Sequence, residues 1–121
     1  MDNDKFKELV LGAIDKLEKQ GVPSKVNYGK INYGCFYLNK ENNHCCIVGH
    51  MMPDDETRVS ADSIGVGSIS DLWECDFEWA LQFHLDQIIV LSKLQELHDD
   101  AQTGKCVVET CQKMREVIKL W

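Results

Sequence analysis

The chain has 121 residues, 44% of them hydrophobic and 27% charged, which is typical of a soluble globular chain rather than a disordered one. Its formal net charge of −7 argues against nucleic acid as a direct ligand, because an acidic surface repels phosphate groups. The same charge is compatible with docking onto a basic protein surface. No apolar run approaches the roughly 20 residues that a membrane-spanning helix needs, so we expect no membrane partner.

The six cysteines could in principle form a disulfide framework. The first residues, MDNDKFKELVLGAIDKL, have the pattern of an amphipathic helix and not of a secretory signal. We therefore expect free thiols in a reducing, cytoplasmic compartment. Most of them should be core residues, since free cysteine is among the most buried residue types.

Apolar residues recur at helical spacing near the start of the chain and predict a helix over residues 4–20. Asp2 or Asp4 could cap its first turn, and Gly21 would end it. The stretch KVNYGKINYGCFYL then carries aromatic and β-branched residues punctuated by glycine. It predicts a small antiparallel β-hairpin over residues 25–38, with strands near 25–29 and 33–38.

The stretch NNHCCIVGHMMPDDE follows. Asn43 is a candidate N-cap and Pro53 closes the segment, so we expect a short helix over residues 45–52. The polar residues 53–69 predict an acidic loop. Ser70 or Asp71 could then open a brief helix.

Asp76 has the character of an N-cap for a long helix over residues 77–99. Its expected buried stripe comprises Phe77, Leu81, Leu85, Ile88, Leu91 and Leu94. Thr103 could cap a last helix over residues 104–121, with Val107, Cys111, Met114, Ile118 and Trp121 on one side. The fold expected for the single compact domain 1–121 is α+β and mostly α. It has three main helices and one short helix packed with the hairpin.

A thiol nucleophile is one interpretation of the adjacent cysteines. In a helix over 45–52, Cys45 or Cys46 would lie in the first turn, where the helix dipole stabilises a thiolate. His98 and Asp99 could supply a base and its orienting group. Neighbouring residues on a helix point apart, however, so Asp99 is a poor partner for His98.

A metal site is a second interpretation, because Cys46 and His50 lie four residues apart on one helical face, with His44 and Cys45 nearby. The rest of the sequence contains no second pair of candidate ligands in a CxxC or HxxxH pattern, so we expect no metal. The nucleotide-binding patterns GxGxxG and GxxxxGK[ST] are missing too, and we expect no cofactor.

A structural role is the third interpretation and the one we favour. The side chains expected to form an interior knot between helices are Cys46, Gly49, His50, Gln95, His98 and Asp99. The outer face would then be free to engage a partner. Its expected partner-binding residues are Asp54, Asp55, Glu56, Asp62 and Trp73.

The order of these motifs is an amphipathic helix, an aromatic-rich hairpin, C-C-x-x-G, S-[IV]-x-x-L, L-Q-x-x-H-D and a final helix. It resembles a set of small uncharacterised proteins from phages and prophages and, more loosely, short bacterial domains whose last motif reads W-N-D. The matching residues are Cys45, Cys46, Gly49, Ser68, Ile69, Leu72, Leu94, Gln95, His98 and Asp99. The resemblance covers residues 5 to about 118 and implies a phage source and this architecture, but no particular reaction.

We therefore expect a non-enzymatic, phage-type protein that binds a host protein with a basic surface. The expected target is a component of an antiviral defence system, which the protein would inhibit. A homodimer is expected as well, since symmetric pairs are the commonest oligomers. Two alternatives stay open: a thiol-dependent hydrolase or transferase using Cys45 or Cys46 with His98 and Asp99, and a sponge that sequesters a nucleotide signal.

Overall fold

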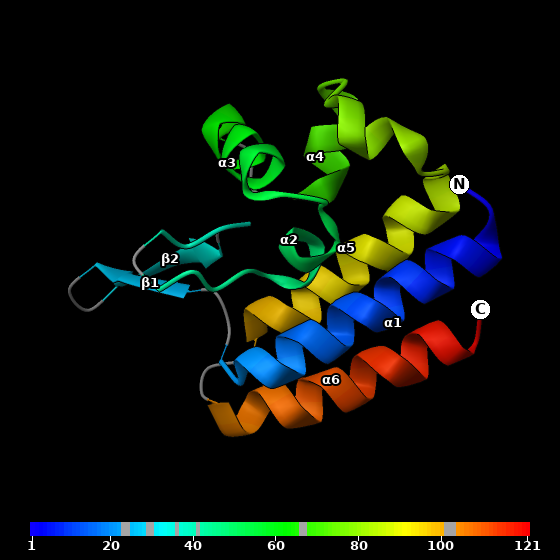
Figure 1. Cartoon of the computed structure of the whole chain (residues 1–121). Helices are drawn as coiled ribbons and strands as arrows, with labels where there is room; N and C mark the ends of the chain where they lie inside the picture. The colour runs from blue at the N-terminus through cyan, green and yellow to red at the C-terminus, as the bar shows by residue number, and fades with distance from the viewer. Residues whose placement is uncertain (23–24, 29–30, 36, 41, 66–67, 101–103) are drawn as a thin grey trace.

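The computed structural model describes residues 1–22, 25–28, 31–35, 37–40, 42–65, 68–100 and 104–121. In this part of the chain six α-helices, one 3-10 helix and two short strands follow one another (Figure 1). They are α1 (Asn3–Gln20), β1 (Lys25–Tyr28), β2 (Ile31–Cys35), α2 (Ile47–Met51), α3 (Asp55–Ile64), α4 (Ile69–Glu74), η1 (Glu78–Gln82), α5 (Leu85–Asp100) and α6 (Gly104–Lys119).

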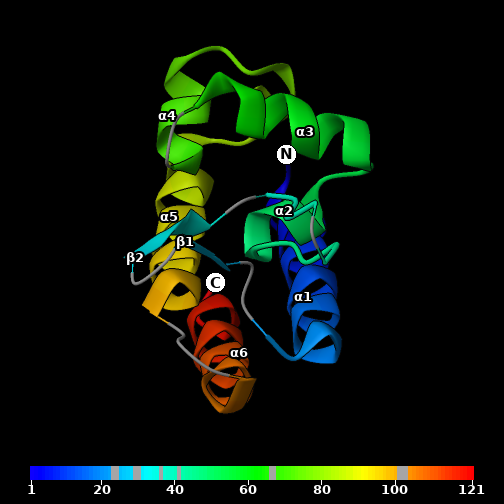
Figure 2. The same cartoon turned by 90° about the vertical axis from the view of Figure 1, so that its left-hand side faces the viewer.

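The core lies between the three long helices and α2. Helix α6 packs against both α1 and α5, while α2 contacts α1 and α5 as well. Helix α4 packs on α5, and α3 and α4 lie on the side of the molecule away from α6 (Figures 1 and 2). The largest fully buried side chains come from all of these layers except α3: Phe6, Ile14, Leu17, Ile47, Met52, Ile69, Leu72, Ile88, Leu91, Leu94, Met114 and Ile118.

Helix α1 follows from local sequence signals. The Asp2 carboxylate accepts a hydrogen bond from the Lys5 backbone N–H at 3.0 Å, which caps the first turn. Gly21 ends the helix in the left-handed conformation at φ 77°, and its N–H donates to the Leu17 carbonyl. The predicted helix over 4–20 is therefore present and begins one residue earlier.

The expected α+β class is wrong, because the molecule is mostly helical and the core of the described residues lies between helices. Strands β1 and β2 pair antiparallel with each other, with Val26 opposite Tyr33 and Tyr28 opposite Ile31. Each strand has the other as its main packing partner, and the ribbon extends beside the end of α1 (Figure 1). The second strand also ends at Cys35, so Tyr37 and Leu38 lie beyond it. Phe36 lies outside the described residues.

The expected acidic loop 53–69 is wrong as well, because most of it is helical. The Asp54 carboxylate caps α3 by accepting from the Thr57 N–H at 2.8 Å, and Gly65 ends the helix at φ 76°. Only Ala61 is buried among the residues of α3. The segment is nevertheless amphipathic, like α1, so helical periodicity is present in its sequence although the helix buries little apolar surface. Helix α4 follows, capped by the Ser68 hydroxyl rather than by Ser70 or Asp71.

The short helix α2 is two residues shorter at its start than predicted, and its cap is different. Cys46 is the N-cap residue, and its Sγ accepts from the Gly49 N–H at 3.3 Å. Asn43, the expected cap, takes the left-handed conformation at φ 59°. It lies four residues before the helix, in a turn closed by a bridge between Asn39 and His44.

The long helix begins at Leu85 and not at residue 77. Asp76 is left-handed at φ 59° and caps nothing, and a 3-10 turn fills the interval. The break is fixed by the buried Gln87 amide, whose Oε1 accepts from the His84 N–H at 3.0 Å and whose Nε2 donates to the Met1 carbonyl at 2.7 Å. Leu81 and Leu85 are exposed, so the expected buried stripe is wrong at these two positions.

The last helix ends at Lys119, two residues before the predicted end. Its expected apolar side is buried over Val107, Cys111, Met114 and Ile118. Trp121 lies beyond the helix, with its ring centroid 5.3 Å from that of Phe6. Thr103, the expected cap, lies outside the described residues.

Candidate functional site

Cys46 lies at the centre of a buried polar cluster around α2. Its side chain is 1% exposed, because α2 is enclosed between α1 and α5. Burial raises the pKa of the Cys46 thiol to about 12, although the hydrogen bond from Gly49 acts in the opposite direction. The thiol is therefore protonated at neutral pH.

Tyr37 belongs to the same cluster, although its sequence pattern predicts a strand residue of the hairpin. Its ring is buried, and among the described residues its hydroxyl makes no hydrogen bond of normal geometry, although the Gln95 side chain lies close to it. Burial raises the pKa of this hydroxyl, and the neighbouring Cys46 thiol raises it further, while the Gln95 side chain partly offsets both. Gln95 is itself engaged, since its Oε1 accepts from the Ile69 N–H at 2.9 Å at the start of α4.

His98 and Asp99 contact each other even though they are adjacent on α5. The His98 Nδ1 lies 3.2 Å from the Asp99 Oδ1, with the imidazole fully buried and the carboxylate half exposed. The expectation that the two side chains point apart is wrong. The Asp99 charge reaches the interior, because it contributes to raising the pKa values of both Cys46 and Tyr37.

His50 fastens α2 to the end of α1. Its Nε2 lies 2.9 Å from the Oε1 of Gln20, whose amide also exchanges two hydrogen bonds with the backbone of Cys45. Burial lowers the pKa of the His50 imidazole to about 4, and the nearby charges of Arg58 and Lys16 act in the same direction. At neutral pH His50 is therefore uncharged and can serve as a hydrogen-bonding group but not as a cation.

Gly49 permits the closest backbone approach in this cluster. A Cβ atom at this position would lie 2.1 Å from the Tyr37 carbonyl oxygen, so no larger residue fits without movement of the backbone. The Gly49 carbonyl accepts from Nε of Arg58 at 2.6 Å, and Nη2 of Arg58 donates to the Met52 carbonyl at 2.9 Å. The close approach joins α2 to the segment after β2, rather than to a second helix.

These contacts bear on the chemistry that the adjacent cysteines could perform. Cys45 is also buried, and burial raises the pKa of its thiol. A cysteine nucleophile needs a thiolate that substrate can reach, and neither thiol meets that requirement. Among the described residues, no group of three or more His, Cys, Asp or Glu side chains is placed to hold a metal ion.

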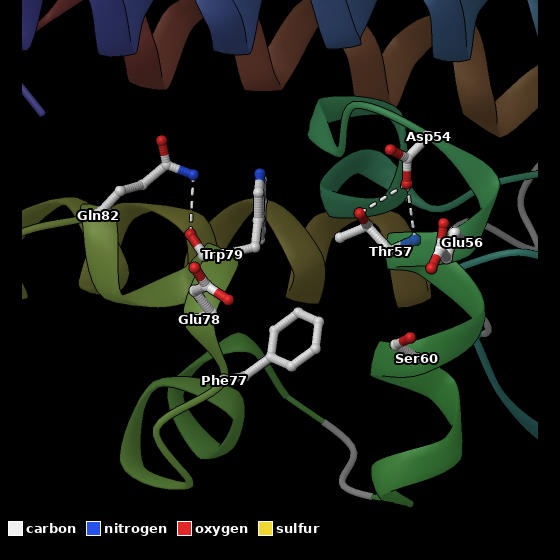
Figure 3. A pocket seen from close by; sticks show the side chains of 8 residues that line it. All are labelled: Asp54, Glu56, Thr57, Ser60, Phe77, Glu78, Trp79 and Gln82. Carbon is white, nitrogen blue, oxygen red and sulfur yellow. Dashed lines mark hydrogen bonds between the residues drawn. The ribbon is translucent and has the colours of Figure 1, made fainter.

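The acidic side of the molecule carries a different feature, an open hollow of about 520 Å³ between α3 and η1 (Figure 3). Helix α3 forms one wall through Asp54, Glu56, Thr57 and Ser60. The segment around η1 forms the other through Phe77, Glu78, Trp79 and Gln82. The Phe77 ring points into the space between the two walls (Figure 3).

The walls of this hollow are held by local contacts. The Asp54 Oδ1 accepts from both the backbone N–H and the hydroxyl of Thr57, and these bonds lower the pKa of the carboxyl group. Gln82 donates to the Trp79 carbonyl at 2.8 Å, and the Trp79 ring packs edge-on against Phe83 at 5.1 Å. The three carboxylates of Asp54, Glu56 and Glu78 are thus presented beside two aromatic rings.

The residues expected to bind a partner fall into separate places. Asp54 and Glu56 line the hollow, whereas Asp55 pairs with Arg58 at 2.6 Å. The Asp62 carboxylate accepts from the backbone N–H groups of residues 37 and 38, at 2.9 and 3.0 Å, and thereby holds the segment after β2. Trp73 lines a second hollow, beside η1 and the start of α5. Phe77 and Glu78 also line the hollow. The sequence pattern did not single them out, because it predicts one long helix through them.

No protein family model matches this chain, and no curated protein or solved structure matches it. The similarity to phage and prophage proteins therefore stays a prediction. In the described part of the chain, no helix combines the length and the apolar character that crossing a membrane requires.

Proposed function

We propose that this protein acts by binding another protein, and that the hollow between α3 and η1 receives a basic segment of that partner. The observation that carries this proposal is the presence of three carboxylates and two aromatic rings around one open space. A lysine or arginine side chain suits both kinds of group. Its charge pairs with carboxylates, and its planar guanidinium group or its methylene stem packs against aromatic rings.

The composition of the hollow supports a protein partner over a small polar ligand. Tryptophan is enriched among the residues that dominate binding energy at protein interfaces, and Trp79 is half-buried at the wall. The carboxylate of Asp54 is fixed by Thr57 before any partner arrives, which reduces the ordering cost of binding. The net charge of −7 would also speed the approach of a basic partner.

The expected phage source suggests which partner this would be. In that setting the basic surface belongs to a host protein in the host cytoplasm, and a component of an antiviral defence system is the target we propose. Occupying a basic surface that normally holds nucleic acid would inhibit such a target by direct competition.

A binding measurement with defined probes tests the hollow directly. We expect a short peptide rich in arginine and lysine to bind in calorimetry, and a peptide with glutamine at those positions not to bind. The triple variant Asp54→Asn, Glu56→Gln and Glu78→Gln should weaken binding roughly tenfold or more, since each carboxylate–cation pair at a partly desolvated site contributes on the order of 1 kcal/mol. Asparagine is chosen at position 54 because it also caps helices well.

The matched control removes the same number of charges elsewhere, through Glu8→Gln, Glu109→Gln and Glu116→Gln. These three side chains are exposed on α1 and α6. If the control variant loses as much affinity as the first, the peptide senses only the overall charge and the proposed site is wrong. The intrinsic fluorescence of Trp79 gives a second readout, because the Trp79→Phe variant should lose the response to the peptide while Trp73 and Trp121 remain.

A further inference from the structure

Helix α5 exposes an apolar line on its outer face. Leu85 and Ile89 lie one helical turn apart and are 56% and 59% exposed. Leu81, at the end of η1, is 48% exposed and shares with Leu85 a second hollow of about 550 Å³. A contiguous line of large exposed apolar side chains on a small protein indicates an interaction surface.

Two exposed charges flank this line on one side. With about 100° of rotation per residue, Asp86 and Lys93 lie about 60° and 40° from Ile89 in the same sense around the helix. Leu85 and Ser92 lie on the opposite side. Asp86 precedes Ile89 along the axis by about one turn, and Lys93 follows it by about the same distance.

Two copies of this face of α5 are complementary in charge when the two helices run antiparallel. When α5 packs antiparallel against α5 of a second copy about a two-fold axis at Ile89, Asp86 of each copy lies opposite Lys93 of the other. Ile89 then meets Ile89, and the charge pairs form twice. A parallel pairing instead places each charge opposite Leu85 or Ser92, so the charges favour the antiparallel pair.

We infer that this face of α5 binds a second copy of the chain through an antiparallel α5–α5 contact. The surface is separate from the acidic hollow between α3 and η1, so it does not depend on the function proposed for that hollow. Trp73 lines the second hollow beside Leu81 and Leu85, at the margin of the contact. Three half-exposed apolar side chains cover only part of the roughly 800 Å² per partner that a stable interface buries, so the dimer exchanges reversibly with monomer.

Sedimentation velocity over a concentration series from micromolar to millimolar tests the contact. We expect the wild-type protein to associate, and Ile89→Glu to shift the dissociation constant upward roughly tenfold or more. Val108→Glu is the matched control, because Val108 is 54% exposed on α6 and receives the same new charge. A wild-type protein that stays monomeric throughout, or a dimer equally tolerant of both substitutions, overturns the inference.

Charge exchange tests the antiparallel register. Asp86→Lys alone should weaken association, because it places a lysine opposite Lys93 at each of the two symmetry-related contacts. This weakening is expected although the substitution makes the protein less acidic overall. Lys93→Asp alone should weaken it too, and the double variant should restore it. Mixing the two single variants should produce a mixed pair, because every contact across it again joins a lysine to an aspartate. If neither the double variant nor the mixture recovers association, the two copies do not meet in this register and the inference is wrong. Circular dichroism melts of each variant separate loss of association from loss of folding.

Discussion

The polar groups around α2 and those around the acidic hollow are similar in kind but differ in their surroundings. Around α2, Cys46 and His98 are enclosed by helices, and burial raises the pKa of the Cys46 thiol. At the hollow, Glu56 and Glu78 remain in contact with water beside aromatic rings. Buried polar groups mainly affect stability. Removing the partner of such a group lowers the free energy of unfolding, because the desolvation of the group is no longer compensated by a hydrogen bond. Exposed groups have little effect on stability and remain available to a partner.

The largest effect that this comparison predicts is at Gly49. Replacing it with alanine would set a Cβ atom against the Tyr37 carbonyl oxygen, so we expect the free energy of unfolding to fall by about 3 kcal/mol. Gly12 is the matched control, because a Cβ there meets nothing within 4 Å on the exposed face of α1. Gly12→Ala should raise stability by roughly 0.5–1 kcal/mol, as alanine favours a helix. Urea unfolding of both variants checks the pair, and equal effects would show that the contact between Gly49 and Tyr37 is not tight.

The second prediction separates two aspartates of the same helix, α3. Asp62→Ala removes the acceptor of two backbone N–H groups, and we expect a loss of about 2 kcal/mol in the free energy of unfolding. Asp55→Ala removes one contact from an exposed carboxylate to the largely buried Arg58 guanidinium, which keeps its bonds to two backbone carbonyls, and should cost only about 0.5 kcal/mol. Denaturant midpoints measured in one buffer compare them. A larger loss at Asp55 would contradict the assignment of Asp62 to holding the segment after β2.

The third prediction concerns pH and His50. Burial lowers the pKa of its imidazole from 6.5 to about 4, so the unfolded chain binds a proton at a higher pH than the folded chain does. The stability that neutral His50 contributes is present above about pH 6.5 and is lost as the pH falls toward about 4. Because the ring is only partly buried, we expect roughly 1–2 kcal/mol of the free energy of unfolding to be lost through this group between about pH 7 and about pH 5.

The His50→Gln variant should have a shallower decline of stability over the same pH range. His84→Gln provides the control for the substitution itself, since His84 is exposed. Chemical unfolding at each pH gives the slopes. An unchanged slope in His50→Gln would mean that the folded protein accepts the proton as readily as the unfolded chain.

The two regions also differ in how far the sequence could predict them. Helix α1 was predictable because its cap at Asp2, its apolar stripe and its stop at Gly21 all act within one segment. Cys46 and His98 were expected in the interior, and both are buried. Their neighbour Tyr37 could not be anticipated, since its approach to α2 at Gly49 is a tertiary contact.

The hollow was harder to predict because the shape of one of its walls depends on a tertiary contact. Helix α3 buries only Ala61, but its amphipathic pattern, its cap at Asp54 and its stop at Gly65 are all signs of a helix within the segment. The apolar spacing of Phe77, Leu81 and Leu85 imitates a continuous helix, and the break there depends on Gln87 reaching the distant Met1 carbonyl. The acidic wall was therefore expected from the sequence, whereas the aromatic wall was not.

The smallest expected effect is the change in protein stability when the carboxylates of the hollow are replaced. The variant with Asp54→Asn, Glu56→Gln and Glu78→Gln should unfold at the same denaturant concentration as the wild-type protein, within error. Asparagine keeps the cap at α3, and the exposed carboxylates of Glu56 and Glu78 lie outside the buried core of the described residues. The same variant is expected to lose affinity for a basic peptide, so stability and binding would separate at this face. A marked loss of stability would instead assign these carboxylates to the fold, and the contrast between the two regions would fail.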